Sequence, residues 1–186
     1  FDTAGSSVTE IVFISAQSEK CVNGLDKSAS NFYVGAAYNE LLSADVDGLL
    51  VKISTAGAAV WVRVFGITNL TDISWDVCYT GYIFVSGTTW GGFNSDSFLY
   101  RYQIDGTKDW STPAVDPSIA DTNYGIDYDI DGKVYVTGSF GNDLVIKKYK
   151  PTNGLMVNLS GLSAKTTLGT TEVNFISPAK IKNFIH

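Results

Sequence analysis

The 186-residue sequence predicts an all-β protein built from a repeated four-stranded antiparallel unit with a period of about 50 residues. Two repeated sequence motifs support this prediction. The first is an acid, a short apolar run, a basic residue and a large apolar residue, and it occupies residues 47–53, 96–102 and 143–149. The second is centred on valines that lie 51 residues apart, namely Val34, Val85 and Val136, and each valine precedes a glycine. A strand-like repeat of this length is typical of propeller blades.

The middle repeat displays the four expected strands in order. Apolar and polar residues alternate over residues 72–79, which predicts a half-buried first strand. A Thr-Gly turn then leads to a second strand at 82–88, and a glycine-rich loop at 90–94 leads to a third strand at 96–104. The following Asp-Gly pair is a strong hairpin signal, and it introduces a fourth short strand at 107–110.

The first and third repeats follow the same order, and both ends of the chain look like parts of further units. Residues 2–8 resemble residues 54–60 at a displacement of 52, so the chain opens on the last strand of a unit. Residues 171–177 and 181–186 read as the first two strands of another. The predicted single β-repeat domain therefore consists of a blade remnant, three whole blades and a partial blade, at residues 1–13, 14–65, 66–113, 114–160 and 161–186.

These phrases resemble the SBBP-type β-propeller repeat family over about residues 30–160. The family motif of glycine, tyrosine, valine, threonine and glycine appears at residues 132–138, and its aspartate-to-tyrosine strand appears at 143–149. The closing tryptophan is Trp61 in the first unit and Trp110 in the second, whereas the third unit has methionine and valine there. The resemblance implies a fold and a role in surface display or interaction more than catalysis.

Composition and charge narrow the classes of function. The net charge is −6, and beyond residues 147–150 no basic cluster exists, which argues against a nucleic-acid partner. The longest apolar runs are far shorter than the roughly 18 residues that a membrane-spanning helix needs, so no membrane span is expected. Because the sequence begins at Phe1 without a signal-peptide pattern, we expect a mature, processed or partly covered chain.

Two sequons predict N-linked glycans at Asn69 and Asn158. Both follow the last strand of a predicted blade, so they should lie on the same rim, although sequons also occur by chance. Together with a sequence that begins at Phe1 instead of an initiator methionine, the two sequons favour an extracellular or cell-surface protein. Cys21 and Cys78 could form a disulfide in such a compartment, or both could be small buried thiols.

One acidic segment resembles the opening of a calcium loop. Asp127, Asp129 and Asp131 are spaced as in D-x-D-x-D-G, but Gly138 occupies the position where a bidentate glutamate would close the site. Any calcium site here should be weak. The alternative is a polar strand with solvent-facing acids that ends in an Asp-Gly turn, and no other cofactor is expected.

Aromatic residues near the glycine-rich loop are candidates for stacking on sugar rings. Trp90 and Phe93 lie in or beside that loop, where binding sites are often built. Trp75 and Tyr124 occupy equivalent positions in successive units. For these two, packing between blades is the simpler interpretation.

The repeated acid and base of each unit point to structure. Lys52, Arg101 and Lys148 each lie five residues after the repeated aspartate, and an odd separation places acid and base on opposite faces of a strand. Recurrence in every unit is what a structural role predicts. The sole histidine is the terminal His186, so the sequence offers no internal histidine to act as a catalytic base. The spacing of the acids does not indicate any particular pair of carboxylates for glycoside hydrolysis.

The sequence therefore predicts an extracellular, glycosylated structural or interaction protein rather than an enzyme, with copies of itself as partners. A remnant at one end and two strands at the other could complete a unit between molecules, which gives a filament or surface layer. They could also close a ring within one chain, or the chain could be a fragment of a longer propeller. A carbohydrate-binding propeller is the main functional alternative, and a glycan-active enzyme comes third.

Overall fold

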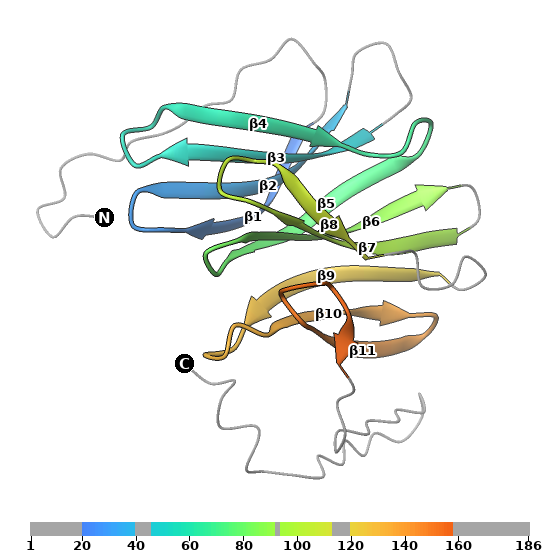
Figure 1. Ribbon diagram of the computed structural model, residues 1–186. Helices are drawn as coiled ribbons and strands as arrows, with labels where there is room; N and C mark the ends of the chain where they lie inside the picture. Colours follow the sequence, from blue (N-terminus) through green and yellow to red (C-terminus); the bar gives the residue numbers. More distant parts are fainter. Residues whose placement is uncertain (1–19, 40–45, 92–93, 113–119, 158–186) are drawn as a thin grey trace, which may run out of the picture.

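The computed structural model describes residues 20–39, 46–91, 94–112 and 120–157 (Figure 1). All regular structure in these residues is β-strand. The strands are β1 (Lys20–Lys27), β2 (Asn31–Asn39), β3 (Val46–Ser54), β4 (Ala59–Phe65), β5 (Thr71–Tyr79), β6 (Ile83–Gly91), β7 (Asn94–Tyr102), β8 (Lys108–Ser111), β9 (Asp121–Tyr128), β10 (Val134–Phe140), β11 (Asp143–Tyr149) and β12 (Met156–Val157). The all-β prediction is confirmed for this part of the chain.

The strands form three antiparallel meanders of four strands each, which we call unit 1 (β1–β4), unit 2 (β5–β8) and unit 3 (β9–β12). Within each unit, every strand pairs with the next one in the chain. A parallel bridge between Val46 and Thr71 also joins units 1 and 2 at one end. The four-strand repeat expected from the sequence is therefore present.

The three units stack in chain order, with unit 2 in the middle (Figure 1). Strand β5 packs on β1, β2 and β3, and β9 packs on β5, β6 and β7. Each unit thus has a rear face, directed at the preceding unit, and a forward face, directed at the following one. Between units 1 and 2 the core includes Tyr33 and Leu50 from unit 1 with Val85 and Phe98 from unit 2. Between units 2 and 3 it includes Phe84, Leu99, Val134 and Val136.

Bulges and glycines give the units the same local shape. The first strand of each unit carries a β-bulge, at Asn23, Trp75 or Tyr124. The glycine that follows each central valine lies where another chain segment comes close. A Cβ atom on Gly35 would lie 2.6 Å from the Ser74 Oγ atom, which is too close for two unbonded atoms. The valine-to-glycine phrase therefore reflects tight packing between strands.

The described strands do not close into a ring, so the propeller arrangement stays a prediction. Within the described ranges there is no helix that is long and apolar enough to cross a lipid bilayer.

Candidate functional site

A hairpin joint links each unit to the next. In unit 1, the Lys52 ammonium and the Trp61 indole N–H both donate to the carbonyl oxygen of Ile104, at 3.0 and 3.1 Å. Ile104 belongs to the turn between β7 and β8 in unit 2. Arg63 adds bonds to the carbonyls of the same turn, with its Nε atom 2.8 Å from the Gly106 oxygen. One backbone turn is thus held by three side chains of the preceding unit.

The same joint recurs between units 2 and 3. The Arg101 guanidinium and the Trp110 indole N–H both donate to the carbonyl oxygen of Pro151, in the turn between β11 and β12. Arg101 also forms an ion pair with Asp109. Register confirms the equivalence, since Lys52 lies opposite Trp61 and Arg101 lies opposite Trp110. The acid and base of each repeat do not pair within a strand, as the sequence predicts for Arg101, which binds Asp109 instead.

A second joint uses a carboxylate and a backbone amide. The Oδ1 atom of Asp26 accepts the N–H of the following residue at 2.7 Å, and its Oδ2 atom accepts the N–H of Tyr79 in unit 2 at 2.6 Å. Asp76 makes the same two kinds of bond, since its Oδ1 atom accepts the next N–H and its Oδ2 atom accepts the N–H of Ile126 in unit 3 at 3.0 Å. The two acids differ in register, because Asp26 lies opposite Tyr33 and Asp76 lies opposite Ser86. Burial raises the pKa of Asp76, although the two N–H bonds act in the opposite direction.

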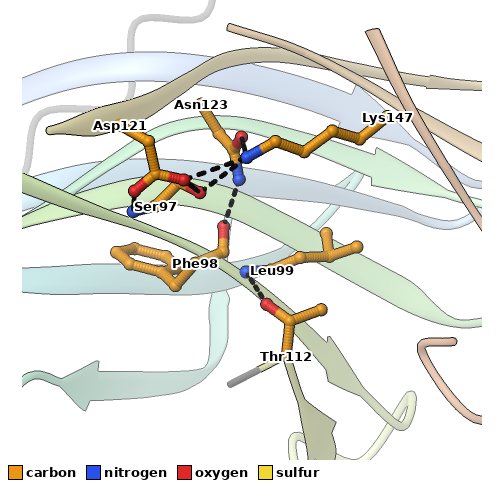
Figure 2. Close-up of polar contacts among 7 residues, drawn as sticks. All are labelled: Ser97, Phe98, Leu99, Thr112, Asp121, Asn123 and Lys147. Atoms are coloured by element: carbon orange, nitrogen blue, oxygen red, sulfur yellow. Dashed lines mark hydrogen bonds and ion pairs between the residues drawn. The ribbon is translucent and has the colours of Figure 1, made fainter. Parts of the chain in front are cut away.

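A buried polar network ties units 2 and 3 together (Figure 2). The Lys147 ammonium lies 3.0 Å from the Asp121 carboxylate and 3.0 Å from the Ser97 hydroxyl. The backbone N–H and the hydroxyl of Ser97 both donate to Asp121. The Asn123 amide donates to the carbonyl of Phe98 at 2.9 Å, next to this group. All of these side chains are buried.

A serine beside a lysine could in principle act as a nucleophile and its base. Here the Ser97 hydroxyl donates to a carboxylate and is only 4% exposed, so a substrate has no access to it. Each polar group finds a partner in the neighbouring unit. The network is therefore a structural tie between two sheets.

Unit 3 has a forward face of the same kind as units 1 and 2. Val134 and Val136 point to the rear, so the alternate residues of β10 and β11 point forward. On this face Leu144 is 82% exposed and Ile146 is 48% exposed. Lys148 occupies the position of Lys52 and Arg101, and the residue opposite it is Val157 instead of a tryptophan.

Asp127 on this face matches Asp26 of unit 1 in position and local geometry. It lies opposite Tyr135, as Asp26 lies opposite Tyr33. Its Oδ1 atom accepts the N–H of Tyr128 at 2.8 Å, and its side chain is exposed. The forward face of unit 3 thus carries a cation, Lys148, like that of the hairpin joint, and a carboxylate, Asp127, like that of Asp26.

The rear face of unit 1 is apolar. Val34, Val51 and Ile53 form a buried cluster there, with Phe32 and Leu49 packed against it. The margins of the same face are exposed and also aliphatic, and they comprise Val22, Leu25, Val62 and Val64. An apolar sheet face of this kind suits packing against another sheet.

Aromatic side chains cluster where β5, β6 and β9 meet. Trp75 contacts Trp90 edge to face, with ring centroids 6.3 Å apart, and it contacts Tyr124 at 5.9 Å. Trp90 is 39% exposed and Tyr124 is 56% exposed. The two residues expected to pack between units do contact each other, but they also leave an accessible aromatic surface. Phe93 lies outside the described residues.

The three acids of the calcium-like segment do not form a cluster. Asp129 accepts the N–H of Lys133 and the Tyr135 hydroxyl, and its carboxylate lies 3.5 Å from the Lys148 ammonium. Asp127 instead accepts a backbone N–H, and Asp131 is exposed in the turn. In the ranges that the structure describes, no three His, Cys, Asp or Glu side chains are grouped to hold a metal ion. The geometry gives the calcium hypothesis no support.

The predicted modification sites have contrasting environments. Asn69 is exposed in the loop between β4 and β5, with a φ angle of 66°, and Asn158 lies outside the described residues.

Cys21 and Cys78 are free thiols, the first exposed on β1 and the second buried on β5. Burial raises the pKa of the Cys78 thiol well above its ordinary value, which keeps it protonated and unreactive.

Neither a scan against protein-family models nor a search of curated proteins finds a match for this chain. The resemblance to SBBP-type repeats thus stays an expectation drawn from the motifs.

Sequence reasoning identified the recurring base but missed what it binds. The signal was present, because Ile104 and Pro151 follow Arg101 and Lys148 by the same three residues. No such signal existed for Lys147, since the equivalent position in the other units is apolar. Its role depends on the neighbouring unit and is visible only in three dimensions.

Proposed function

We propose that this protein is an extracellular structural or interaction protein whose propeller-type repeats assemble head to tail into a filament or surface layer. One observation carries the proposal. The same kind of hairpin joint links unit 1 to unit 2 and unit 2 to unit 3, and the forward face of unit 3 carries a base, Lys148, at the position of Lys52 and Arg101. A stack that repeats its own interface can be extended by further copies.

The end faces differ from each other, which fixes the geometry of assembly. The forward face of unit 3 exposes Leu144 and Ile146 beside Lys148, whereas the rear face of unit 1 has an apolar centre of Val34, Val51 and Ile53. A contact between two different surfaces is heterologous, and it generates rings or open filaments according to whether its rotation closes. We favour the open filament.

Glycosylation belongs to the same proposal. Asn69 is an exposed sequon in the loop between units 1 and 2, away from the hairpin joints. We propose an N-linked glycan there, on the rim between units 1 and 2, and a second at the sequon of Asn158. Intact mass of the secreted protein before and after glycosidase treatment tests this, and an unchanged mass would refute it.

Electron microscopy of the native material is the direct test of the proposed role. We expect filaments or sheets whose repeat matches one copy of the chain. Discrete particles of one size at every concentration would contradict the formation of filaments or sheets. Closed rings of several copies would support the head-to-tail contact but would show that it forms a ring instead of a filament.

Carbohydrate binding is the second candidate, and the aromatic surface formed by Trp75, Trp90 and Tyr124 favours it. Exposed aromatic rings with apolar faces suit stacking on sugars. Isothermal titration with simple sugars, repeated with Trp90→Ala, tests this function. Sugar binding by the wild type that is lost in the variant would support a lectin function. The absence of measurable binding to any of the sugars would exclude this function.

The proposal assigns no catalytic residue. The buried Ser97 and Lys147 are already engaged with Asp121, and the acids Asp127 and Asp129 hold backbone N–H groups.

A further inference from the structure

We infer that a groove between units 1 and 2 binds a sugar acid, with the Lys52 ammonium bonding to its carboxylate and the Tyr82 ring stacking on its pyranose ring. This site goes beyond the proposed self-assembly and does not depend on it. Three features support it: a buried cation that has no ion-pair partner in the described part of the chain, the groove that this cation lines, and an exposed aromatic ring in the same groove.

Lys52 differs from the two equivalent cations in its electrostatic environment. Arg101 forms an ion pair with Asp109. Lys148 lies 3.5 Å from Asp129. Within the described ranges Lys52 forms no ion pair, although it is only 8% exposed, and its ammonium donates to a backbone carbonyl. An ammonium has three N–H donors, so two remain for an anion that would neutralise the buried charge.

The register shows which acid is missing beside Lys52. In β8, Asp109 is the extra residue of a bulge, directly before the tryptophan that lies opposite Arg101. In β4, the extra residue of the same bulge is Val60, directly before the tryptophan that lies opposite Lys52. Val60 is 51% exposed. Because valine replaces the acid, this position cannot supply the ion pair that unit 2 forms.

Lys52 lines a groove of about 640 Å³ between the two units. One wall is the turn between β7 and β8, and the other is the turn between β5 and β6. A groove of this volume lies within the range of small-molecule sites, about 300–1,000 Å³. The residues that line it are Lys52, Gly81, Tyr82, Gln103, Ile104 and Asp105.

The charges around the groove favour an anion, although the whole chain has a net charge of −6. Arg63 holds the same turn as Lys52, with its Nη2 atom 3.1 Å from the Asp105 carbonyl oxygen. The Asp105 side chain is exposed, and its Oδ1 atom accepts the N–H of Thr107 at 2.8 Å. Among the described residues that line the groove or hold its turn, two cations thus face one acid. A locally positive groove on an acidic protein selects an anionic ligand.

Tyr82 supplies the apolar surface of the site. It lies directly before β6 and is 42% exposed. The Arg101 guanidinium lies over its ring, with the Cζ atom 4.2 Å from the centroid, and Arg101 itself lines a different pocket. The ring is therefore held in place from outside the groove. A ligand with a carboxylate for Lys52 and an apolar ring face for Tyr82 is a uronic acid.

Isothermal titration of the full chain with glucuronate tests this site. We expect glucuronate to bind at least about tenfold more tightly than glucose, which lacks the carboxylate, and than acetate, which lacks the ring. Acetate that binds as tightly as glucuronate would overturn the assignment to a sugar acid. The absence of glucuronate binding would overturn the site itself.

One substitution restores the missing acid without removing the cation. Val60→Asp places a carboxylate beside Lys52 and leaves the hairpin joint intact, so the affinity for glucuronate should fall about tenfold. Val62→Asp adds the same charge two residues further along β4, where the valine is 45% exposed, and should leave the affinity unchanged. Equal losses in the two variants would reduce the effect to overall charge and would overturn the role of Lys52.

Three further variants locate the ligand. Asp105→Asn removes the acid of the groove but keeps the acceptor for the Thr107 N–H, so the affinity should rise about threefold, a gain that misfolding cannot produce. Tyr82→Ala should lower the affinity about tenfold. Trp90→Ala should have no effect, because Trp90 lies at the opposite end of β6. A loss of binding in Trp90→Ala, or unchanged binding in both Asp105→Asn and Tyr82→Ala, would place the ligand elsewhere and overturn the inference.

Discussion

The interface between units 1 and 2 and the interface between units 2 and 3 have similar contacts at their edges but different side chains at their centres. Between units 1 and 2 the centre is aromatic, with Tyr33 stacked on Tyr79 at 4.9 Å and Phe65 edge-on to Phe98 and Tyr100. Between units 2 and 3 it includes a buried ion pair between Lys147 and Asp121. Both interfaces are bordered by the same hairpin joint and by a carboxylate that binds an amide of the next unit.

This difference shows what the repeat specifies. The hairpin carbonyls of Ile104 and Pro151 lie at equivalent places in their units, so the cations that bind them recur at one repeated position. The space between the sheets has no such constraint and is filled differently each time. The joints therefore define how units stack, and the centres determine how strongly each pair holds.

The largest effect is expected at the charged centre. Lys147→Ala leaves Asp121 buried without its partner, which should lower the free energy of unfolding by about 3–5 kcal/mol. Urea denaturation measures this change. Lys27→Ala, on the exposed edge of β1, is the control and should have little effect. A loss below about 1 kcal/mol for Lys147→Ala would mean that this buried ion pair contributes little to the stability of the network.

The aromatic centre should respond less to a change that keeps it apolar. Phe65→Leu removes two edge-to-face contacts, each worth about 0.5–1.5 kcal/mol, and should cost about 1–3 kcal/mol in the same assay. The exposed Ile67→Val serves as its control. If the two variants are equally stable, the rings do not hold units 1 and 2 together.

The shared hairpin joint predicts equal effects at both interfaces. Trp61→Phe and Trp110→Phe each remove one indole donor while a neighbouring cation still binds the same carbonyl. Each should cost about 0.5–1.5 kcal/mol. Chemical denaturation of both variants checks this, and a large effect in one with none in the other would break the equivalence of the joints.

The smallest effect concerns pH. Burial alone would raise the pKa of Asp129, but the Lys133 N–H, the Tyr135 hydroxyl and Lys148 outweigh it, so the pKa lies below its ordinary value of 3.8. A lowered folded-state pKa means that this carboxylate stabilises the protein above pH 3.8 and that the benefit is lost as pH falls through the folded value.

The stability gap between the wild type and Asp129→Asn should accordingly narrow as the pH falls below about 4. Thermal unfolding at a series of pH values measures the gap. Asp131→Asn, in the same turn, is the control. A gap that is constant, or that widens in acid, would contradict the role given to Asp129.

The sequence predicted the strands and their order because alternation and turn residues are local signals. It also placed Lys52, Arg101 and Lys148 on one repeated position. It could not predict that these side chains bind the next unit, because a carbonyl acceptor has no side-chain signature. The bonds that Lys147 and Asp76 make between units were also missed, because their partners Ser97 and Ile126 each lie 50 residues away, in the adjacent unit.

Sedimentation velocity of the full chain, compared with a chain that lacks residues 1–13, tests the central claim most directly. We expect the full chain to form faster-sedimenting species as its concentration rises, and the shortened chain to sediment as a monomer throughout. A full chain that stays monomeric at high concentration, and that is unchanged by the deletion, would contradict head-to-tail assembly.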